Sequence, residues 1–387
     1  MRRLLLSLLI ITPLGIESSS ASVVLPQPFY NHVNSKFLSN PGVVLIDQSN
    51  NEIIYQNEAD KPRIPASVLK IFSTAAVALT LDSKTTFQTS LYKTNKKGVF
   101  VLLGDYDPWI TSSIKYRDAN NRAYMPKLIK AAFASDKKLK KINLLYKGVS
   151  GTDIYQAKKA LKRRASVAYR PIDKGVEVES LITEKIASIE SPPLEKMIRF
   201  ALLYSDNVLS QKLAMLAARK SGLPLTNEGL NETVITKVSS LGVDTTGLKF
   251  VDGSGLSNKN RVSAITVAQL LVKVKSDPRL KPIYEYLPIS GESGTLSSRF
   301  IETAPQAIGL VRAKTGSIKG TVSLAGFATS GETEYVFVVL ADDVGRTRSL
   351  QDAARRAIDR MIGAITKPPV TGITPPTAES TPTTTTS

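Results

Sequence analysis

The chain contains no cysteine and a single histidine, His32. The lack of cysteine excludes disulfide bonds, thiolate metal sites, a cysteine nucleophile and a lipid-modified N-terminal cysteine. One histidine cannot make a zinc site of several imidazoles, and a Ser-His-Asp triad would have to use His32 itself. We therefore expect chemistry that depends on Ser, Thr, Lys, Tyr, Asp, Glu or backbone groups, with no cofactor and no metal.

Acidic residues are also scarce relative to basic ones, with 33 Asp and Glu against 51 Lys and Arg. The resulting formal net charge of +18 favours anionic partners, such as nucleic acid, a membrane surface or an acidic polymer. Hydrophobic residues make up 42% of the 387 residues, enough for a large buried core. We expect one main domain with an insertion and short disordered ends.

The first 22 residues have the three-part pattern of a secretory signal peptide. A basic start at 1–3 precedes a largely apolar run at 4–16, and small residues suited to cleavage follow at 17–22. The apolar run is too short for an ordinary transmembrane helix, and a buried N-terminal helix is the alternative. We expect export to the periplasm, cell envelope or extracellular space, with no integral membrane span after processing. There the basic chain would meet cell-wall or membrane anions rather than nucleic acid.

The rest of the chain divides by its patterns into a main domain, an inserted subdomain and a tail. We expect the main domain at 23–83 and 176–365, the insertion at 84–175, and a disordered Thr- and Pro-rich tail at 366–387. The insertion includes a strongly basic stretch at 137–164, which is either a solvated face or a patch for an anionic polymer.

Several elements of the main domain are predicted from local pattern. Apolar runs flank a polar turn at 48–51, which indicates a hairpin, and two further runs at 324–328 and 335–340 indicate paired strands. Residues 194–216 are predicted to form one helix, because two prolines precede an apolar-periodic stretch. An amphipathic helix at 349–365 is expected to pack on the sheet rather than to anchor the chain in a membrane.

The sequence Ser67-Val68-Leu69-Lys70 opens an apolar, helix-compatible run. In a helix, positions three apart share a face, so the Lys70 amine would lie close to the Ser67 hydroxyl. A serine becomes nucleophilic when a base takes its proton, and a lysine can be that base if burial or nearby cations lower its pKa. The pattern alone is weak evidence, since it recurs at 112–115 and 135–138.

A second motif, Ser205-Asp206-Asn207, lies inside the helix predicted at 194–216. Ser, Asp and Asn are unfavourable in helix interiors, so they indicate a turn or a site there, although a local cap or irregularity would also explain them. Ser205 could relay a proton to a leaving amine. Asn207 could hold a substrate amide or the Lys70 side chain.

The third motif, Lys314-Thr315-Gly316-Ser317, follows an apolar run and is predicted to form an edge strand that can pair with an extended substrate. Gly316 permits close approach, and Lys314 and Thr315 suit a terminal carboxylate. The backbone N–H of Ser317, together with that of Ser67, could form an oxyanion hole.

Together, the three motifs are typical of penicillin-binding proteins and class A β-lactamases, and they occur here in that order. Three further segments support the comparison: 103–108, 252–263 and 294–300. The sequence most resembles the D-alanyl-D-alanine carboxypeptidase/endopeptidase branch of the low-molecular-mass class C penicillin-binding proteins. The spacing between the first two motifs is short for this branch, which predicts that one accessory subdomain is kept and another is reduced or lost.

The resemblance implies an α/β (α+β) fold of the penicillin-binding-protein and serine β-lactamase type, with the smaller subdomain inserted. It implies a serine hydrolase that cleaves D-Ala-D-Ala in peptidoglycan stem peptides through a Ser67 acyl-enzyme, with β-lactam antibiotics as inhibitors. The catalytic residues would be Ser67, Lys70 and Ser205. The substrate-binding residues would be Asn207, Lys314, Thr315, Gly316 and Ser317.

Other functions stay open at this point. A β-lactamase of class A type needs a glutamate-held water for rapid deacylation, and the glutamates at 177, 179, 184 and 190 precede the second motif, where that residue is not expected. An esterase of the same fold is harder to separate by sequence. A wall-binding protein on an inactive scaffold is disfavoured by the complete motif set, and a nucleic-acid binder by the signal peptide.

Overall fold

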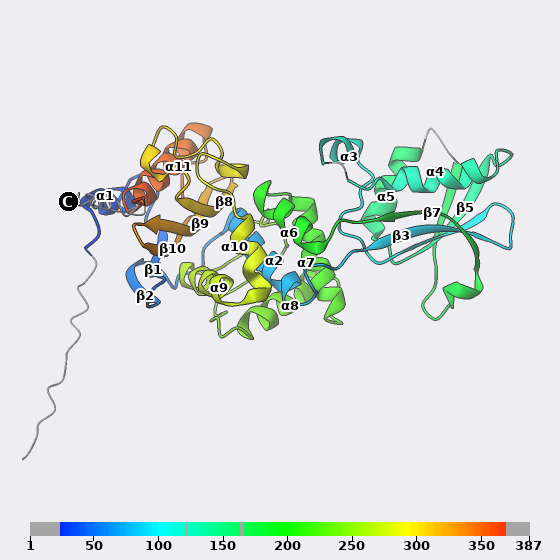
Figure 1. Ribbon diagram of the computed structural model, residues 1–387, viewed down its shortest axis with the longest axis horizontal. Coiled ribbons are helices and arrows are strands. Elements are labelled where there is room, and N and C mark those ends of the chain that lie inside the picture. The colour runs from blue at the N-terminus through cyan, green and yellow to red at the C-terminus, as the bar shows by residue number, and fades with distance from the viewer. Residues whose placement is uncertain (1–23, 121, 163–165, 369–387) are drawn as a thin grey trace, which may run out of the picture.

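The computed structural model describes residues 24–120, 122–162 and 166–368. The expected signal peptide lies outside these residues, as does the tail from 369 onward. Figure 1 shows an elongated molecule with a sheet beside α1 and α11 at one end, a group of helices in the middle and a second sheet at the other end. Within the described ranges, no helix is long and apolar enough to cross a membrane.

The first sheet is five-stranded and antiparallel, in the order β2-β1-β10-β9-β8. Its strands are β1 Gly42–Asp47, β2 Glu52–Asn57, β8 Val311–Ile318, β9 Thr321–Ser330 and β10 Thr333–Ala341. The hairpin expected around 48–51 and the paired strands expected near 324–340 are therefore confirmed. The strand that carries Lys314, β8, lies at the sheet edge, as the sequence predicted.

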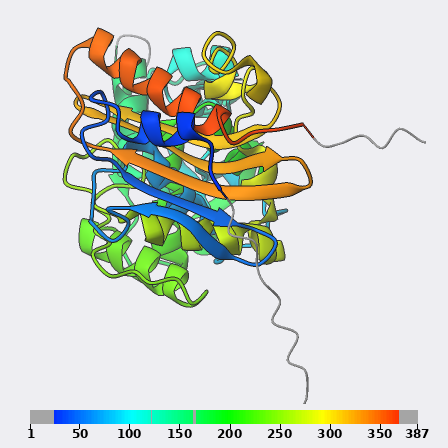
Figure 2. The same ribbon diagram turned by 90° about the vertical axis from the view of Figure 1, so that its left-hand side faces the viewer.

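Both faces of this sheet are buried, because alternate residues of the central strands enter two different cores. In β10, Val336, Val338 and Leu340 join the core formed with the middle helices. Their neighbours Phe337 and Val339 join the core beneath α1 and α11. Figure 2 shows α1 and α11 lying along one face of the sheet. The terminal helix thus packs on the sheet, as expected.

The middle of the molecule is helical. Its helices are α2 Lys70–Ala78, α6 Leu194–Leu203, α7 Asn207–Lys220, α8 Asn227–Ser239, α9 Ala264–Ser276 and α10 Lys281–Tyr286, with α1 Gln27–Val33 and α11 Arg348–Gly363 on the far side of the sheet. Short 3₁₀ turns lie at η1 Ala66–Leu69, η2 Val178–Ser180, η3 Pro278–Leu280, η4 Gly294–Leu296 and η5 Pro305–Ala307. All residues of α2 are buried, so its first residue, Lys70, is removed from water.

The inserted domain is built on a second five-stranded sheet, in the order β6-β5-β4-β3-β7. Its elements are β3 Gln88–Thr94, β4 Val99–Gly104, α3 Ile114–Asn120, α4 Met125–Ser135, β5 Lys141–Lys147, α5 Gly151–Leu161, β6 Ser166–Pro171 and β7 Ile182–Glu190. The strands β4, β5 and β6 are parallel, whereas β3 pairs antiparallel with β4 and β7. The domain has its own core, in which α4 and α5 pack on the sheet.

Three boundaries differ from the sequence-based expectation. The inserted domain ends near Glu190 rather than 175, because β7 returns to pair with β3. The helix expected at 194–216 is two helices, α6 and α7, because Ser205 has a φ of 55° and Asp206 caps a new helix. Ordered chain also continues past the expected tail boundary, since Lys367 pairs with Ser330 of β9.

Candidate active site

The Ser67 hydroxyl lies in a tight turn between β8 and the loop that begins at Asp252. Two glycines make this packing possible. A Cβ at Gly255 would lie 2.0 Å from the carbonyl oxygen of Ala66, and one at Gly316 would lie 2.7 Å from that of Pro65. Because both obstacles are backbone atoms, larger residues would displace the turn that presents Ser67.

Lys70 contacts the Ser67 hydroxyl directly, with 2.7 Å between Nζ and Oγ. The same Nζ donates to Asn207 Oδ1 at 2.7 Å and to the carbonyl oxygen of Ser254 at 2.5 Å. Burial lowers the pKa of Lys70 to about 7, although the carboxylates of Asp252 and Asp206 oppose this shift. The structure therefore presents an amine that can be neutral near pH 7, hydrogen-bonded to a serine hydroxyl and two neutral oxygens.

The other two Ser-x-x-Lys patterns form no such pair. The buried Ser112 hydroxyl donates to the carbonyl oxygen of Asp153, and the Ser135 hydroxyl donates to that of Ala132. Lys70 is buried, whereas Lys115 and Lys138 are exposed, so the spacing gives a serine–lysine contact here only where the fold buries the lysine.

The turn between α6 and α7 brings Asn207 to Lys70. Asp206 caps α7, because its Oδ1 accepts from the backbone N–H of Leu209 at 2.8 Å. Ser205 precedes this cap and is half-buried, and its hydroxyl makes no hydrogen bond to any residue that the structure describes. The second motif therefore meets the first through Asn207, while Ser205 remains available to a substrate.

The third motif lies on β8, beside the turn that carries Ser67. Lys314 is fully buried and donates to the carbonyl oxygen of Thr315 at 3.0 Å. Desolvation, and then the charge of Lys70, hold the pKa of Lys314 well below its usual range. The Thr315 hydroxyl donates a hydrogen bond to the Thr295 hydroxyl. Gly316 packs against the turn that carries Ser67. The structure thus brings the Lys314 segment to the side of the Ser67 turn.

Ser317 is exposed at the end of this motif, and its Oγ accepts a 2.7 Å hydrogen bond from Arg355 of α11. The sequence analysis missed Arg355. A single arginine on an amphipathic helix gives no local signal, and only the packing of α11 on the sheet brings it to Ser317.

The loop from Asp252 to Asn260 orients the carbonyl that holds Lys70. Asp252 Oδ1 accepts from the backbone N–H groups of Ser254 and Gly255, both at 2.8 Å, and Oδ2 accepts from Asn260. Burial alone would raise the pKa of Asp252, but hydrogen bonds from Ser254, Ser257 and Asn260 lower it overall. The sequence analysis quoted this segment without giving Asp252 a role. Its Asp-Gly-Ser-Gly pattern was the available signal for a tight, carboxylate-centred loop.

A cleft of about 900 Å³ adjoins these residues and lies between the two domains. Asn207, Ser254 and the apolar side chains of Met215 and Leu216 line it from the main domain. Tyr106 and the start of α5 line it from the inserted domain. Among the described residues, no group of three or more His, Asp or Glu side chains is arranged to hold a metal ion.

Comparisons with known proteins agree with this geometry. The model of the D-Ala-D-Ala carboxypeptidase 3 (S13) family matches residues 32–117 and 175–364. A carboxypeptidase DacB of Mycolicibacterium smegmatis is 29% identical over 381 residues, which cover 85% of this chain and 82% of that protein.

Two solved structures show the same fold. Penicillin-binding protein 4 (dacB) of Haemophilus influenzae has a TM-score of 0.67 at 18% identity, over 85% of this chain and 98% of that one. A penicillin G-acylated predatory endopeptidase of Bdellovibrio bacteriovorus has a TM-score of 0.56 at 19% identity, over 85% and 93%.

The resemblance and fold class inferred from sequence are thus confirmed. A match to the family model over more than half of the chain places it among these enzymes, and the comparisons identify the chemistry as that of a serine peptidase. The chain belongs to the D-Ala-D-Ala carboxypeptidase 3 (S13) family and is a serine D-Ala-D-Ala carboxypeptidase of the penicillin-binding type.

Proposed function

We propose that Ser67 is the nucleophile and that neutral Lys70 is its general base. The observation that carries this assignment is the 2.7 Å contact between Lys70 Nζ and Ser67 Oγ, made by a lysine whose pKa is lowered to about 7. Lys70 takes the hydroxyl proton as Oγ attacks the carbonyl carbon of the penultimate D-Ala. The tetrahedral intermediate then collapses, and the C–N bond to the terminal D-Ala breaks.

The leaving amine needs a proton, and Ser205 is proposed to relay it from protonated Lys70. Ser205 suits this role because it lies two residues from Asn207, which contacts Lys70, and its hydroxyl has no other hydrogen bond among the described residues. Water then attacks the acyl ester while Lys70 takes one of its protons, the bond between the acyl carbon and Ser67 Oγ breaks, and Lys70 returns the proton to Oγ. The products are free D-Ala and a shortened stem peptide.

Substrate binding is assigned to Asn207 and to the exposed edge of β8. The substrate backbone would pair along Lys314 to Ser317, with the backbone N–H groups of Ser67 and Ser317 stabilising the developing oxyanion. The hydroxyls of Thr315 and Ser317 are proposed to bind the terminal carboxylate, and the Arg355 guanidinium beside Ser317 supports this role. Gly316 lets the strand approach the nucleophile turn.

We further infer that the enzyme is exported and acts on peptidoglycan stem peptides, including cross-links if it is also an endopeptidase. β-Lactams would acylate Ser67 because they imitate D-Ala-D-Ala. The inserted domain presents a groove of about 820 Å³ lined by Lys158, Lys159 and Lys162, beside the exposed Tyr155. This groove is suited to an anionic cell-wall polymer, whose binding would weaken as salt is added.

The decisive experiment is covalent labelling of the purified chain by a fluorescent penicillin, read on a denaturing gel. We expect a stable band that Ser67→Ala abolishes and that Lys70→Ala forms about a hundredfold to ten-thousandfold more slowly, the usual range for losing a general base. Release of D-Ala from a muropeptide should fall in parallel. Rapid loss of the β-lactam without a band would identify a β-lactamase instead. Absence of both labelling and turnover would favour an esterase or an inactive wall-binding protein.

A further inference from the structure

The inserted domain contacts the turn that carries Asn207 through one buried arginine. Nη1 of Arg122 lies 3.5 Å from Oδ2 of Asp206, and the two side chains are only 1% and 6% exposed. The other carboxylate oxygen of Asp206 caps α7. The Asp206 carboxylate therefore contacts both the start of α7 and the inserted domain.

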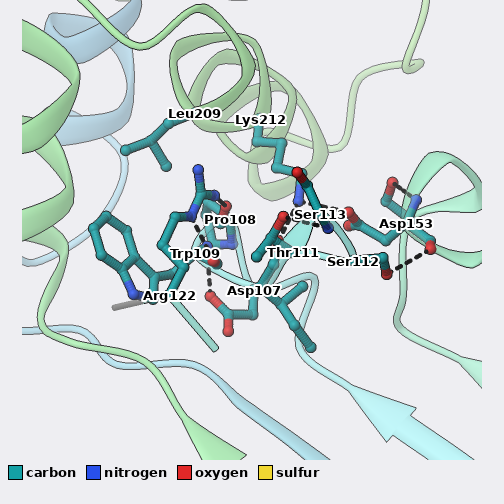
Figure 3. Close-up of polar contacts among 12 residues, drawn as sticks. Asp107, Pro108, Trp109, Thr111, Ser112, Ser113, Arg122, Asp153, Leu209 and Lys212 are labelled. Carbon is teal, nitrogen blue, oxygen red and sulfur yellow. Dashed lines mark hydrogen bonds and ion pairs between the residues drawn. The ribbon is translucent and has the colours of Figure 1, made fainter. Parts of the chain in front are cut away.

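The rest of the Arg122 guanidinium is fixed by its own domain. Nε donates to the carbonyl oxygen of Trp109 and Nη2 to that of Pro108, both at 2.9 Å. The guanidinium also lies 5.0 Å from the Trp109 ring centroid, and Figure 3 shows it beside this segment. Nη1 is buried and makes no hydrogen bond within the described ranges. The one part of the guanidinium without such a bond is thus the part that faces Asp206.

We propose that Arg122 is a positioning residue of the active site, which holds the Ser205–Asn207 turn through Asp206 and balances the charge of that carboxylate. The proposal rests on the proposed function, in which Lys70 is the general base. Asn207 directly follows Asp206 and its Oδ1 lies 2.7 Å from Lys70 Nζ, so a shift of Asp206 displaces a partner of the base. Misplacement by about 1 Å can cost about a hundredfold in rate.

Arg122 also has an electrostatic effect on Lys70. The groups that face Lys70 are Ser67 from η1, Asn207 and Asp206 at the start of α7, Asp252 from its loop and Lys314 from β8. Asp206 and Asp252 raise the pKa of Lys70. With Arg122 removed, the Asp206 carboxylate acts on Lys70 uncompensated, so less of the lysine is neutral at a given pH.

Other titratable groups surround Arg122 itself, namely Asp107, Asp153 and the phenol of Tyr116, in addition to Asp206. Lys212 of α7 forms an ion pair with Asp153, which is a second polar contact between the domains. Arg122 lies outside the two ranges that the family model matches, 32–117 and 175–364. The proposed contact is therefore a contribution of this chain's inserted segment to a site built by the family's shared domain.

The test compares Arg122→Gln and Asp206→Asn, using the penicillin acylation rate as a function of pH in the whole chain. Asn retains the helix cap and removes the charge. We expect Arg122→Gln to slow acylation by about tenfold or more, because it unpairs a buried carboxylate, and to move the acidic limb of the pH profile to higher pH. Asp206→Asn should move the limb in the opposite direction. Arg122→Lys, which keeps the charge, should recover much of the rate.

The matched control is Lys93→Gln, which removes an inserted-domain cation that pairs with Glu184 far from α7 and should leave rate and limb unchanged. If Arg122→Gln fails to fold, the double variant Arg122→Gln/Asp206→Asn removes both charges together. Its limb should then lie at higher pH than that of Asp206→Asn, in which the Arg122 charge still acts on Lys70. A wild-type rate and limb in Arg122→Gln, or, where that variant does not fold, a limb in the double variant equal to that of Asp206→Asn, would overturn the proposal. If penicillin failed to label the wild-type chain at all, the proposed function itself would be refuted.

Discussion

Two neighbouring clusters bury a lysine, and they differ in what the lysine binds. In the candidate active site, Lys70 Nζ is hydrogen-bonded to three neutral oxygens, from Ser67, Asn207 and Ser254. Between the domains, Lys212 donates to the carboxylate of Asp153 at 2.8 Å and to the carbonyl oxygen of Ile110 at 2.7 Å. In the first cluster the amine bonds to no carboxylate, whereas the second contains an ion pair.

This difference explains how one fold uses the same side chain in two ways. Burial lowers the pKa of both lysines, but Asp153 opposes the shift at Lys212 through direct contact. At Lys70 the opposing carboxylates, Asp252 and Asp206, make no direct bond to the amine. A buried lysine is therefore suited to proton transfer when its bonded partners are neutral, and to joining domains when one partner is a carboxylate.

The largest expected effect comes from breaking the second cluster. Lys212→Met leaves Asp153 buried without its cation, which should lower the free energy of unfolding by about 3–5 kcal/mol. Chemical denaturation followed by circular dichroism would measure this loss. The double variant Lys212→Met/Asp153→Asn should recover most of the stability, because no uncompensated charge remains. Equal stability of the single variant and the wild type would mean that the ion pair does not join the domains.

The next effect concerns the pH dependence of the first cluster. Lys70 acts as a base when neutral, so acylation should be fast above its pKa of about 7 and fall as the pH decreases and the amine takes a proton. Two pH units below that pKa, the rate should be about a hundredfold lower, since each unit reduces the neutral fraction about tenfold. Stopped-flow labelling by a penicillin would give the profile. A flat profile across this range would exclude Lys70 as the titrating base.

Exchanging the partner type should convert the first cluster toward the second. Asn207→Asp places a carboxylate where Lys70 now has an amide oxygen, and an adjacent opposite charge favours the protonated amine. The pKa of Lys70 should rise by about one unit or more, with about a tenfold lower acylation rate near neutral pH. The rate should recover at higher pH. A loss that is equal at all pH values would indicate displaced geometry rather than a shifted pKa.

The sequence analysis predicted the meeting of Ser67, Lys70 and Asn207 better than the contact between the domains. The motif residues Ser67, Lys70, Asn207 and Lys314 could be found because each lies in a short pattern, and three patterns in order are informative. The β8 edge and the paired strands were predicted from apolar runs. The partner roles of Ser254 and Asp252 were missed, because the contact that holds Lys70 is a backbone carbonyl, whose direction no side-chain pattern encodes.

The remaining errors have one physical cause, namely pairing between segments distant in the sequence. β7 belongs to the inserted domain because it pairs with β3, about ninety residues earlier, and nothing local in β7 indicates that partner. The break between α6 and α7 at Ser205 was predicted only in part. The polar motif was expected to form a turn or a site, but one helix was predicted to continue through it. Arg122, Asp153 and Lys212 were missed because they meet only when the two domains pack.

The smallest expected effect tests whether burial, rather than ion pairing as such, distinguishes the two clusters. Lys93 and Glu184 form a 2.7 Å pair with the same chemistry as Lys212 and Asp153, but their side chains are 36% and 61% exposed. Lys93→Gln should change the free energy of unfolding by no more than about 1 kcal/mol, because water solvates the remaining carboxylate. Denaturation alongside Lys212→Met gives a direct comparison. Losses of similar size in the two variants would show that desolvation is not what makes the interdomain pair important.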